Sequence, residues 1–288
     1  MSSSAVGDRW LVAPNLSADA TGSIHDDAQA KELGFKGALI GGSVTTSFMT
    51  PALTEQFGQA WYERGFLKQS FIAPLYEQEE FRVVFDELPS ADGDECLFSL
   101  ALEKRSGEQH TAGYAGLARS AGDAAAPWER PGEPVASEEF DEDPLPGQEV
   151  GTLFPPIERT VSASDPESLR RRRTTGDESP WYSERSPWGG PIVPTFMYTL
   201  MGLRLATPPS DGAATNSAGM NGTFQLLLTG PMLCDEPYRL QGRLAEKGWG
   251  RRSAFRTVEF AVTGSDGRRV AVVRQKVRWL AQPPAGAS

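Results

Sequence analysis

The sequence has little cysteine, no long apolar run and no excess of positive charge. Its two cysteines, Cys96 and Cys234, lie far apart without CxxC or Cys/His spacing. This pattern excludes a disulfide framework and a structural zinc site, and predicts two buried apolar side chains. No stretch approaches the ~20 apolar residues that span a bilayer, and the first residues lack the basic-then-apolar order of a signal peptide. We therefore expect a cytoplasmic protein without a membrane partner, a metal or another cofactor.

The charge balance is acidic. With 28 Lys and Arg against 38 Asp and Glu, the formal net charge is −10. Nucleic-acid phosphates require a basic stripe, and the single basic cluster, Arg170 to Arg173, is short. A nucleic-acid partner is therefore not expected. The apolar fraction of 39%, together with 14 Phe and 7 Trp, instead indicates a folded chain.

The chain contains an internal repeat. Residues 74–82 (PLYEQEEFR) match residues 231–239 (PMLCDEPYR) in their proline, acidic, aromatic and arginine positions, at an offset of 157 residues. The same offset places His25 opposite Tyr182, inside two segments that are alike in character. A Gly-rich apolar stretch follows each segment, at 37–42 and at 189–194. Because separate blocks agree on one register, duplication is the simplest explanation.

The predicted elements follow the same order in both halves. Apolar residues at helical spacing predict a long, kinked helix over 43–63, capped by Ser43 or Thr45 and containing Pro51, and a second helix over 191–205. Runs of β-forming residues predict an antiparallel meander after each helix, at 69–76, 80–86, 95–104 and 110–120, and at 221–229, 237–246, 253–263 and 268–280.

These elements predict an α+β fold in which a sheet buries one helix per half. The turn signals Ala-Asp-Gly-Asp at 91–94 and Ser-Gly-Glu at 106–108 separate strands of the first half. Residues 121–150 are rich in Ala, Pro, Glu and Asp, which indicates a surface linker. We expect one repeat over 1–120 and a second over 151–288.

The motif segments resemble those of a known family. An Asp-x-x-x-x-His segment followed by a Gly-rich turn that opens a long helix is similar to the hydratase motif of the MaoC-like, (R)-specific enoyl-CoA hydratases and dehydratases. The resemblance covers nearly the whole chain and implies the double-hotdog branch, in which two tandem hotdogs each wrap a sheet around a central helix. It implies a small-molecule acyl-thioester or hydrophobic substrate, and it leaves a homodimer open.

Neither copy carries the complete catalytic pair. The first keeps His25 but has Ala20 in place of the Asp, whereas the second keeps Asp177 but has Tyr182 in place of the His. In the family, the Asp and His hold the water that adds across a 2-enoyl thioester, with a base and an acid both required. Tyrosine, with an ordinary pKa of ~10, can donate a proton but is a poor relay. The resemblance makes Asp177 the base, Tyr182 a hydrogen-bond donor and His25 part of a second site. Because each family pair belongs to one hotdog, residues of different repeats are not expected to converge.

The Gly-rich turns and aromatic residues give the expected substrate contacts. In the family, N–H groups at the start of the central helix bind the thioester carbonyl, which implies Gly41, Gly42 and Ser43 in one half and positions up to Thr195 in the other. Pro191 and Pro194 lack N–H groups. Trp181 and Trp188 belong to a set of aromatic residues where the family places its acyl tunnel, although most of that set is also expected in the core. Arg170–Arg173 is open to two interpretations, a solvated helix face or a contact to coenzyme A phosphates.

Two functions of different class are consistent with these residues. The first is a hydratase/dehydratase-type lyase acting on an acyl-thioester or a polyketide-like substrate, with incomplete motifs and therefore an altered reaction. The second is a non-catalytic hotdog that binds an acyl group or a protein partner. A common cavity beside His25 and Asp177 favours the enzyme, whereas separate sites sealed by tryptophans favour binding.

Overall fold

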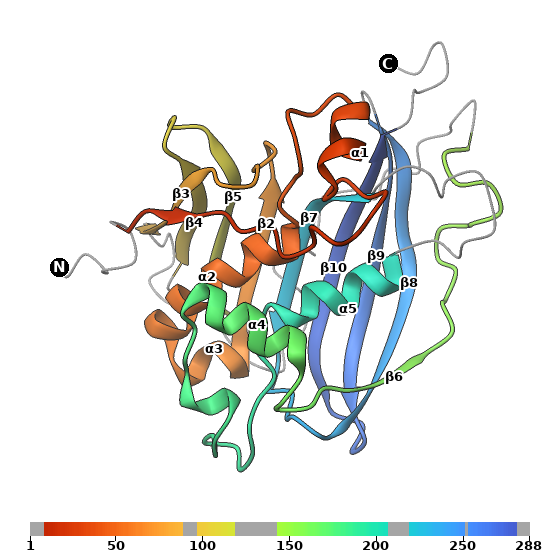
Figure 1. The fold of residues 1–288 in the computed structure, drawn as a ribbon. Helices are drawn as coiled ribbons and strands as arrows, with labels where there is room; N and C mark the ends of the chain where they lie inside the picture. Colours follow the sequence, from red (N-terminus) through yellow and green to blue (C-terminus); the bar gives the residue numbers. More distant parts are fainter. Residues whose placement is uncertain (1–8, 89–96, 119–142, 207–218, 251–252, 281–288) are drawn as a thin grey trace.

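The protein forms one continuous antiparallel sheet that carries helices against one face. The computed structural model describes residues 9–88, 97–118, 143–206, 219–250 and 253–280. Within these ranges the sheet has ten strands, in the order β1-β3-β4-β5-β2-β7-β10-β9-β8-β6 (Figure 1). The first half supplies β1 (Leu11–Val12), β2 (Gly65–Phe71), β3 (Glu80–Leu88), β4 (Leu97–Lys104) and β5 (Gln109–Leu117). The second half supplies β6 (Ile157–Thr160), β7 (Gly219–Leu228), β8 (Pro237–Gly250), β9 (Ser253–Gly264) and β10 (Arg269–Leu280).

The two halves meet edge to edge at the centre of the sheet. Strand β2 of the first half pairs with β7 of the second, with Phe66 opposite Leu227 and Gln69 opposite Phe224. This seam hydrogen-bonds the repeats through their backbones, so that no sheet edge is left open between them. Any helix lying over the seam can therefore contact residues from both halves.

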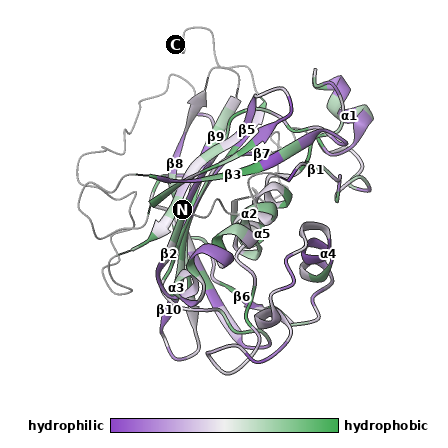
Figure 2. Cartoon of the chain, turned by 90° about the vertical axis from the view of Figure 1, so that its left-hand side faces the viewer, coloured by the Kyte–Doolittle hydropathy of each residue, from purple (hydrophilic) through white to green (hydrophobic). Residues whose placement is uncertain are grey.

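Each half contributes a central helix to the same face of the sheet. These are α2 (Gly42–Phe57) and α5 (Met197–Ala206), which lie side by side in both views (Figures 1 and 2). Helix α4 (Pro166–Thr175) contacts α2 from the side away from the sheet. Three short helices complete the described part of the chain, namely α1 (Asp27–Glu32), α3 (Gln59–Arg64) and the 3-10 turn Pro180–Tyr182.

The first central helix differs from the predicted one in its cap and its break. Gly41 is the N-cap, and the hydroxyls of Thr45 and Thr46 donate back to the Gly42 carbonyl, so the predicted Ser43 or Thr45 cap is wrong. Pro51 lies inside α2 without ending it. The helix ends at Gly58, whose φ of 53° is a left-handed conformation that favours glycine, and α3 starts directly after it.

The other boundaries agree more closely, with two exceptions. The first strand of the meander is β2 at Gly65–Phe71, earlier than the predicted 69–76. Helix α5 begins at Met197, later than the predicted 191, because Pro191 and Pro194 hold the preceding segment extended. The predicted turn at 91–94, most of the predicted linker and Cys96 lie outside the described residues.

Equivalent backbone bonds relate the two repeats. The Leu39 N–H donates to the Ile24 carbonyl at 2.9 Å, and the Ile192 N–H donates to the Trp181 carbonyl at 2.8 Å. These acceptors are separated by the 157-residue offset of the sequence repeat. The same offset relates Gln78 and Asp235, two non-glycine residues with positive φ, at 65° and 63°. The backbone of the duplicated unit therefore follows one plan in both halves, while the domain limits at 120 and 151 stay a prediction.

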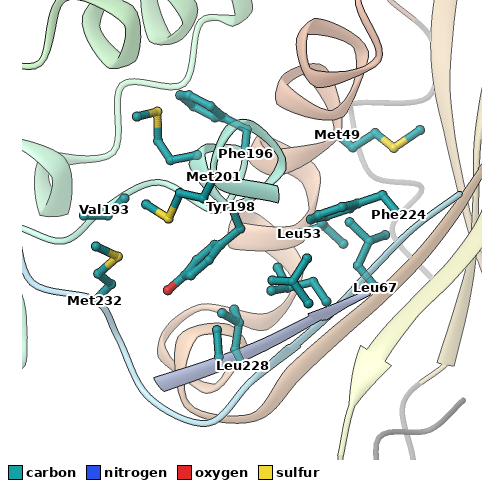
Figure 3. Packing of buried hydrophobic residues seen from close by; sticks show 14 of the residues in the cluster. Met49, Leu53, Leu67, Val193, Phe196, Tyr198, Met201, Phe224, Leu228 and Met232 are labelled. Atoms are coloured by element: carbon teal, nitrogen blue, oxygen red, sulfur yellow. The ribbon is translucent and has the colours of Figure 1, made fainter. Parts of the chain in front are cut away.

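One hydrophobic cluster spans both repeats. It includes Met49, Leu53 and Leu67 from the first half, and Phe196, Tyr198, Met201, Phe224 and Met232 from the second, all shown in Figure 3. Phe224, on the seam strand β7, is fully buried. Burial on this scale stabilises the fold by roughly 1.5–3 kcal/mol for each large apolar side chain. Since the cluster is shared, the two halves are expected to unfold together.

Candidate functional site

Asp177 is held inside the protein by the end of helix α4. Gly176 closes that helix in a left-handed conformation with φ 73°, and the Asp177 N–H donates to the Arg172 carbonyl at 3.0 Å. The turn directs the Asp177 side chain inward, and only 4% of the residue is exposed. Burial raises the pKa of this carboxyl from 3.8 to about 6, against the opposing effects of the Tyr182 hydroxyl, the Ser179 N–H and the Arg172 charge.

Tyr182 joins this carboxylate to the other repeat. Its hydroxyl donates to Asp177 Oδ2 at 3.2 Å and lies 2.7 Å from the hydroxyl of Tyr62 on α3. An ionised carboxylate can only accept, so Tyr182 donates to Asp177 and accepts from Tyr62. Burial raises the pKa of Tyr62 and of Tyr182 well above that of free tyrosine. Both phenols therefore stay protonated and act as donors near neutral pH.

A further side-chain hydrogen bond lies beside this chain, at the start of α5. The Trp61 indole N–H donates to Thr195 Oγ1 at 2.9 Å. The Tyr62 hydroxyl lies 3.3 Å from Thr54 Oγ1. Burial raises the pKa of Tyr62, and Thr54, Tyr182 and, least of all, Thr195 oppose this rise. Because an indole N–H can only donate and a carboxylate can only accept, Trp61 donates to Thr195 at one end of this group and Tyr182 donates to Asp177 at the other. We call Trp61, Thr195, Tyr62, Tyr182 and Asp177 the relay.

Aromatic side chains cover the relay. Trp181 and Trp188 contact each other edge to face with ring centroids 5.7 Å apart, and both contact the Tyr62 ring, at 6.0 and 5.7 Å. The two tryptophans are partly exposed, whereas Tyr182 is 1% and Tyr62 2% exposed. The Trp188 indole also donates to Glu63 at 3.3 Å. The tryptophans therefore separate the relay from solvent.

The arginine cluster is divided between the interior and the surface. Arg170 and Arg173 are exposed, but Arg171 is 3% and Arg172 8% exposed. Arg171 pairs with Glu167 at 2.6 Å, and the Arg172 guanidinium lies 5.5 Å from the centre of the Tyr182 ring. The predicted solvated face is therefore wrong for Arg171 and Arg172, which pack inward. The Arg172 charge helps to keep the buried Asp177 ionised.

Backbone N–H groups lie unpaired at the start of both central helices. In the described structure, no backbone carbonyl accepts from Thr195 or Phe196 in the second repeat, or from Gly42 or Ser43 in the first. The neighbouring backbone hydrogen bonds are equivalent in the two repeats. The Val44 N–H donates to the Gly41 carbonyl, and the Met197 N–H donates to the Pro194 carbonyl. Such groups favour a partial negative charge, as on a polarised carbonyl oxygen.

His25 occupies the equivalent position in the first repeat but lies closer to solvent. Its Nδ1 lies 2.7 Å from the Leu39 carbonyl, and the residue is partly exposed. Burial, together with the nearby Arg171 charge, lowers the pKa of the imidazole below 6.5 in spite of the Leu39 bond. Its ring is close to Gly41, where an added Cβ would lie 3.4 Å from Cε1. His25 is therefore neutral near pH 7 and borders the start of α2.

The predicted residues form two groups. Asp177, Tyr182, Thr195, Trp181 and Trp188 gather around the relay, and His25, Gly41, Gly42 and Ser43 gather at the start of α2. No hydrogen bond within the described residues joins His25 to Asp177. Separate motif residues are expected for the two repeats, but Tyr62, a residue of the first repeat outside either motif, hydrogen-bonds Tyr182 of the second.

The relay members from the first repeat carry no motif signal. Trp61 and Tyr62 stand out in the sequence only as aromatic residues of the first helical region, and Thr54 does not stand out at all. Tyr62 and Tyr182 are separated by 120 residues. Their meeting depends on how the two repeats pair, which no spacing within one repeat reveals.

A pocket of about 340 Å³ lies beside the first motif segment. Its lining is half polar and half apolar, and includes the charged side chains of Asp27, Lys36 and Glu79. It therefore differs in character from the apolar acyl cavity that the family resemblance implies, which stays a prediction. No group of three His, Cys, Asp or Glu side chains in the described ranges could hold a metal ion. No described helix is long and apolar enough to span a bilayer.

Comparisons with known proteins identify the fold. No family model and no curated protein matches the sequence. Among solved structures, a MaoC domain protein from Chloroflexus aurantiacus is 12% identical, with 96% of this chain and 94% of that chain covered and a TM-score of 0.63. A MaoC-like dehydratase is 14% identical, with 94% and 95% covered and a TM-score of 0.60. A double-hotdog protein of Mycobacterium tuberculosis is 13% identical, with 94% of both chains covered and a TM-score of 0.60. The chain therefore has the double-hotdog fold and resembles the MaoC-like dehydratases in structure.

Proposed function

We propose that the protein is a hydratase/dehydratase-type lyase that acts on an acyl-thioester or polyketide-like substrate at the relay. The observation that carries this proposal is the buried carboxylate of Asp177, hydrogen-bonded to Tyr182 at the position where the family has its catalytic pair. A pKa of about 6 leaves Asp177 mostly ionised at neutral pH and close to the ideal for a general base.

The chemistry divides between the base and the donors. In the hydration direction, the Asp177 carboxylate takes a proton from water, the hydroxide adds to the β-carbon of a 2-enoyl thioester, and the protonated Asp177 then delivers that proton to the α-carbon. Dehydration reverses these steps. The unpaired N–H groups of Thr195 and Phe196 would bind the thioester carbonyl oxygen as negative charge develops on it. Trp181 and Trp188, being partly exposed, would border the entrance for the acyl chain.

Tyr62 of the first repeat supplies a hydrogen-bond donor that the second motif lacks. Where the family has a histidine able to relay protons, Tyr182 offers one hydroxyl, and its proton is committed to Asp177. Tyr62 holds that hydroxyl in place from the other repeat at 2.7 Å. The proposed site is therefore composite, and the altered motif supports an altered reaction within the lyase class. His25 and the start of α2 form a separate site that we expect to contribute little.

The test is an assay of hydration of 2-enoyl-CoA substrates and dehydration of 3-hydroxyacyl-CoA substrates of different chain length. Asp177→Asn keeps the shape and removes the base, and loss of a general base typically costs ~100- to 10,000-fold in rate. Glu178→Gln is the matched control, since it makes the same chemical change one residue later at an exposed position. His25→Ala should cost much less than Asp177→Asn.

Two results would contradict the assignment. If His25→Ala abolishes activity while Asp177→Asn leaves it intact, the first repeat holds the working site. If no substrate of this class turns over but acyl-CoA esters still raise the melting temperature, the protein is the non-catalytic acyl-binding hotdog instead. The separation of His25 from Asp177 and the tryptophans over the relay favour this second candidate, so the assay decides between the two.

A further inference from the structure

A buried hydroxyl lies beside the proposed site without any hydrogen-bond partner. Tyr198, in the first turn of α5, is 1% exposed, and its Oη makes no hydrogen bond to any residue that the structure describes. An unpaired hydroxyl in an apolar interior is unfavourable, and phenylalanine would fill almost the same space without that penalty. A native group of this kind therefore requires an explanation.

The surroundings of this hydroxyl are apolar and adaptable. Figure 3 shows the Tyr198 hydroxyl directed toward the side of the cluster where Met232 and Leu228 lie, with Met201 and Val193 nearby. Two methionines of this cluster, Met201 and Met232, lie around Tyr198. Unbranched thioether side chains rearrange easily around a ligand. An acyl chain entering here would meet apolar walls and one polar atom.

Tyr198 is also coupled to the relay by position. Its N–H donates to the Thr195 carbonyl at 3.2 Å, and the Thr195 side chain is a relay member. The hydroxyls of Tyr62 and Tyr238 are near enough to help raise the pKa of Tyr198, after the larger effect of burial. The unpaired hydroxyl therefore lies within the same region as the proposed catalytic groups but does not belong to the relay.

We propose that Tyr198 is a specificity-determining residue whose hydroxyl hydrogen-bonds an oxygen atom on the acyl chain, so that the site prefers hydroxylated or keto-substituted chains over plain aliphatic ones. This inference rests on the proposed function and adds a substrate class to it. A site that hydrogen-bonds a substrate oxygen discriminates against the analogue lacking it, because the buried group of the protein is then left unpaired.

The experiment compares octanoyl-CoA with a series of hydroxyoctanoyl-CoA isomers that differ in the position of the hydroxyl. Binding to the full-length protein is measured by isothermal titration calorimetry. The wild type should bind at least one isomer about five- to tenfold more tightly than octanoyl-CoA, as one added hydrogen bond provides. Tyr198→Phe should remove this preference while binding octanoyl-CoA as well as the wild type does.

Tyr238→Phe is the matched control. Tyr238 lies in the same cluster, but its hydroxyl accepts from the Leu233 N–H at 2.8 Å. Its removal should lower the melting temperature and keep the preference, whereas Tyr198→Phe should keep or raise the melting temperature. If wild type and Tyr198→Phe discriminate equally, or the wild type shows no preference, the Tyr198 inference is wrong and the proposed function stands. If neither octanoyl-CoA nor any isomer binds, acyl binding fails and both proposals fail with it.

Discussion

The motif loops of the two repeats share the same backbone hydrogen bonding but carry different functional side chains. The bonds from Leu39 to Ile24 and from Ile192 to Trp181 fix the two motif loops in the same way. On that frame the first repeat holds a neutral, partly exposed histidine, whereas the second holds a carboxylate that is 4% exposed. Duplication therefore preserved the geometry of the loop, while burial and side-chain identity separated the chemistry of the two copies.

This difference extends to the response to pH. The first repeat contains His25 and His110, whose pKa values are lowered mainly by burial, and the second contains Asp177, whose pKa burial raises. A lowered histidine pKa makes the folded protein less stable toward acid, because the unfolded chain takes up the proton more readily. A raised aspartate pKa has the opposite effect, since the folded protein holds the proton more tightly. The two repeats are thus predicted to respond to pH with opposite signs.

The largest change of folding stability with pH is expected from His110. Burial lowers its pKa from 6.5 to about 4, with Lys104 also lowering it and the Ala73 carbonyl, Glu79 and Glu108 opposing. Stability should be complete above pH 6.5 and decrease as the pH falls toward 4, by roughly 3 kcal/mol in total. His110→Asn offers an N–H to the Ala73 carbonyl but cannot become charged. Urea unfolding at several pH values measures the free energy of unfolding of both proteins. The wild type should lose more of it than the variant as the pH falls, and an equal loss in both proteins would contradict the prediction.

Asp177 should give the opposite trend with a similar size. Its pKa is 3.8 in the unfolded reference and about 6 in the folded protein. The stability that the protonated form provides is present below pH 3.8 and is lost as the pH rises through 6, by roughly 3 kcal/mol. Asp177→Asn resembles the protonated form. Its free energy of unfolding, relative to that of the wild type, should therefore increase as the pH rises from 4 to 7. Glu178→Gln, at an exposed position, should follow the wild type; a gain in this control as well would remove Asp177 as the cause.

Sequence reasoning reached the architecture because the repeat left a register in the chain. The 157-residue offset placed His25 opposite Tyr182, and equivalent backbone bonds now relate the two loops. The boundaries it missed have local physical causes. Pro51 lies inside α2, and the helix ends instead at Gly58, where φ is 53° and favours glycine.

The composition of the site was harder to predict. The motif register identifies Asp177 and Tyr182, but the burial that raises the pKa of Asp177 arises only in the folded chain, where 4% of the residue is exposed. Tyr62 comes from the other repeat, and only the pairing of β2 with β7 brings α3 near the second motif. A pattern within one repeat cannot contain that information.

The starts of the two central helices allow a steric comparison. Gly42 aligns with Thr195, but an added Cβ at Gly42 would lie 2.5 Å from Asn221 Nδ2 and 2.8 Å from Phe71 Cε1. Gly42→Ala should therefore destabilise the protein by about 2 kcal/mol through overpacking. Gly190→Ala, where an added Cβ meets nothing within 4 Å, is the control and should change little. Thermal unfolding of both variants measures the difference, and equal melting temperatures would show that Asn221 and Phe71 move aside without cost.

The smallest expected stability losses concern Thr54 and Thr195, two threonines near Tyr62 that come from different repeats. Thr195→Val leaves the buried Trp61 N–H without its acceptor and should cost about 1 to 2 kcal/mol. Thr54→Val removes only a 3.3 Å bond, and Tyr62 keeps its bond to Tyr182, so the loss should be about 0.5 kcal/mol. A double-mutant cycle of each with Tyr62→Phe should give the larger coupling for Thr195 if the relay runs from Trp61 through Thr195 to Tyr62. A larger coupling for Thr54 would mean that Tyr62 is held from its own repeat, and the relay would then begin at Thr54.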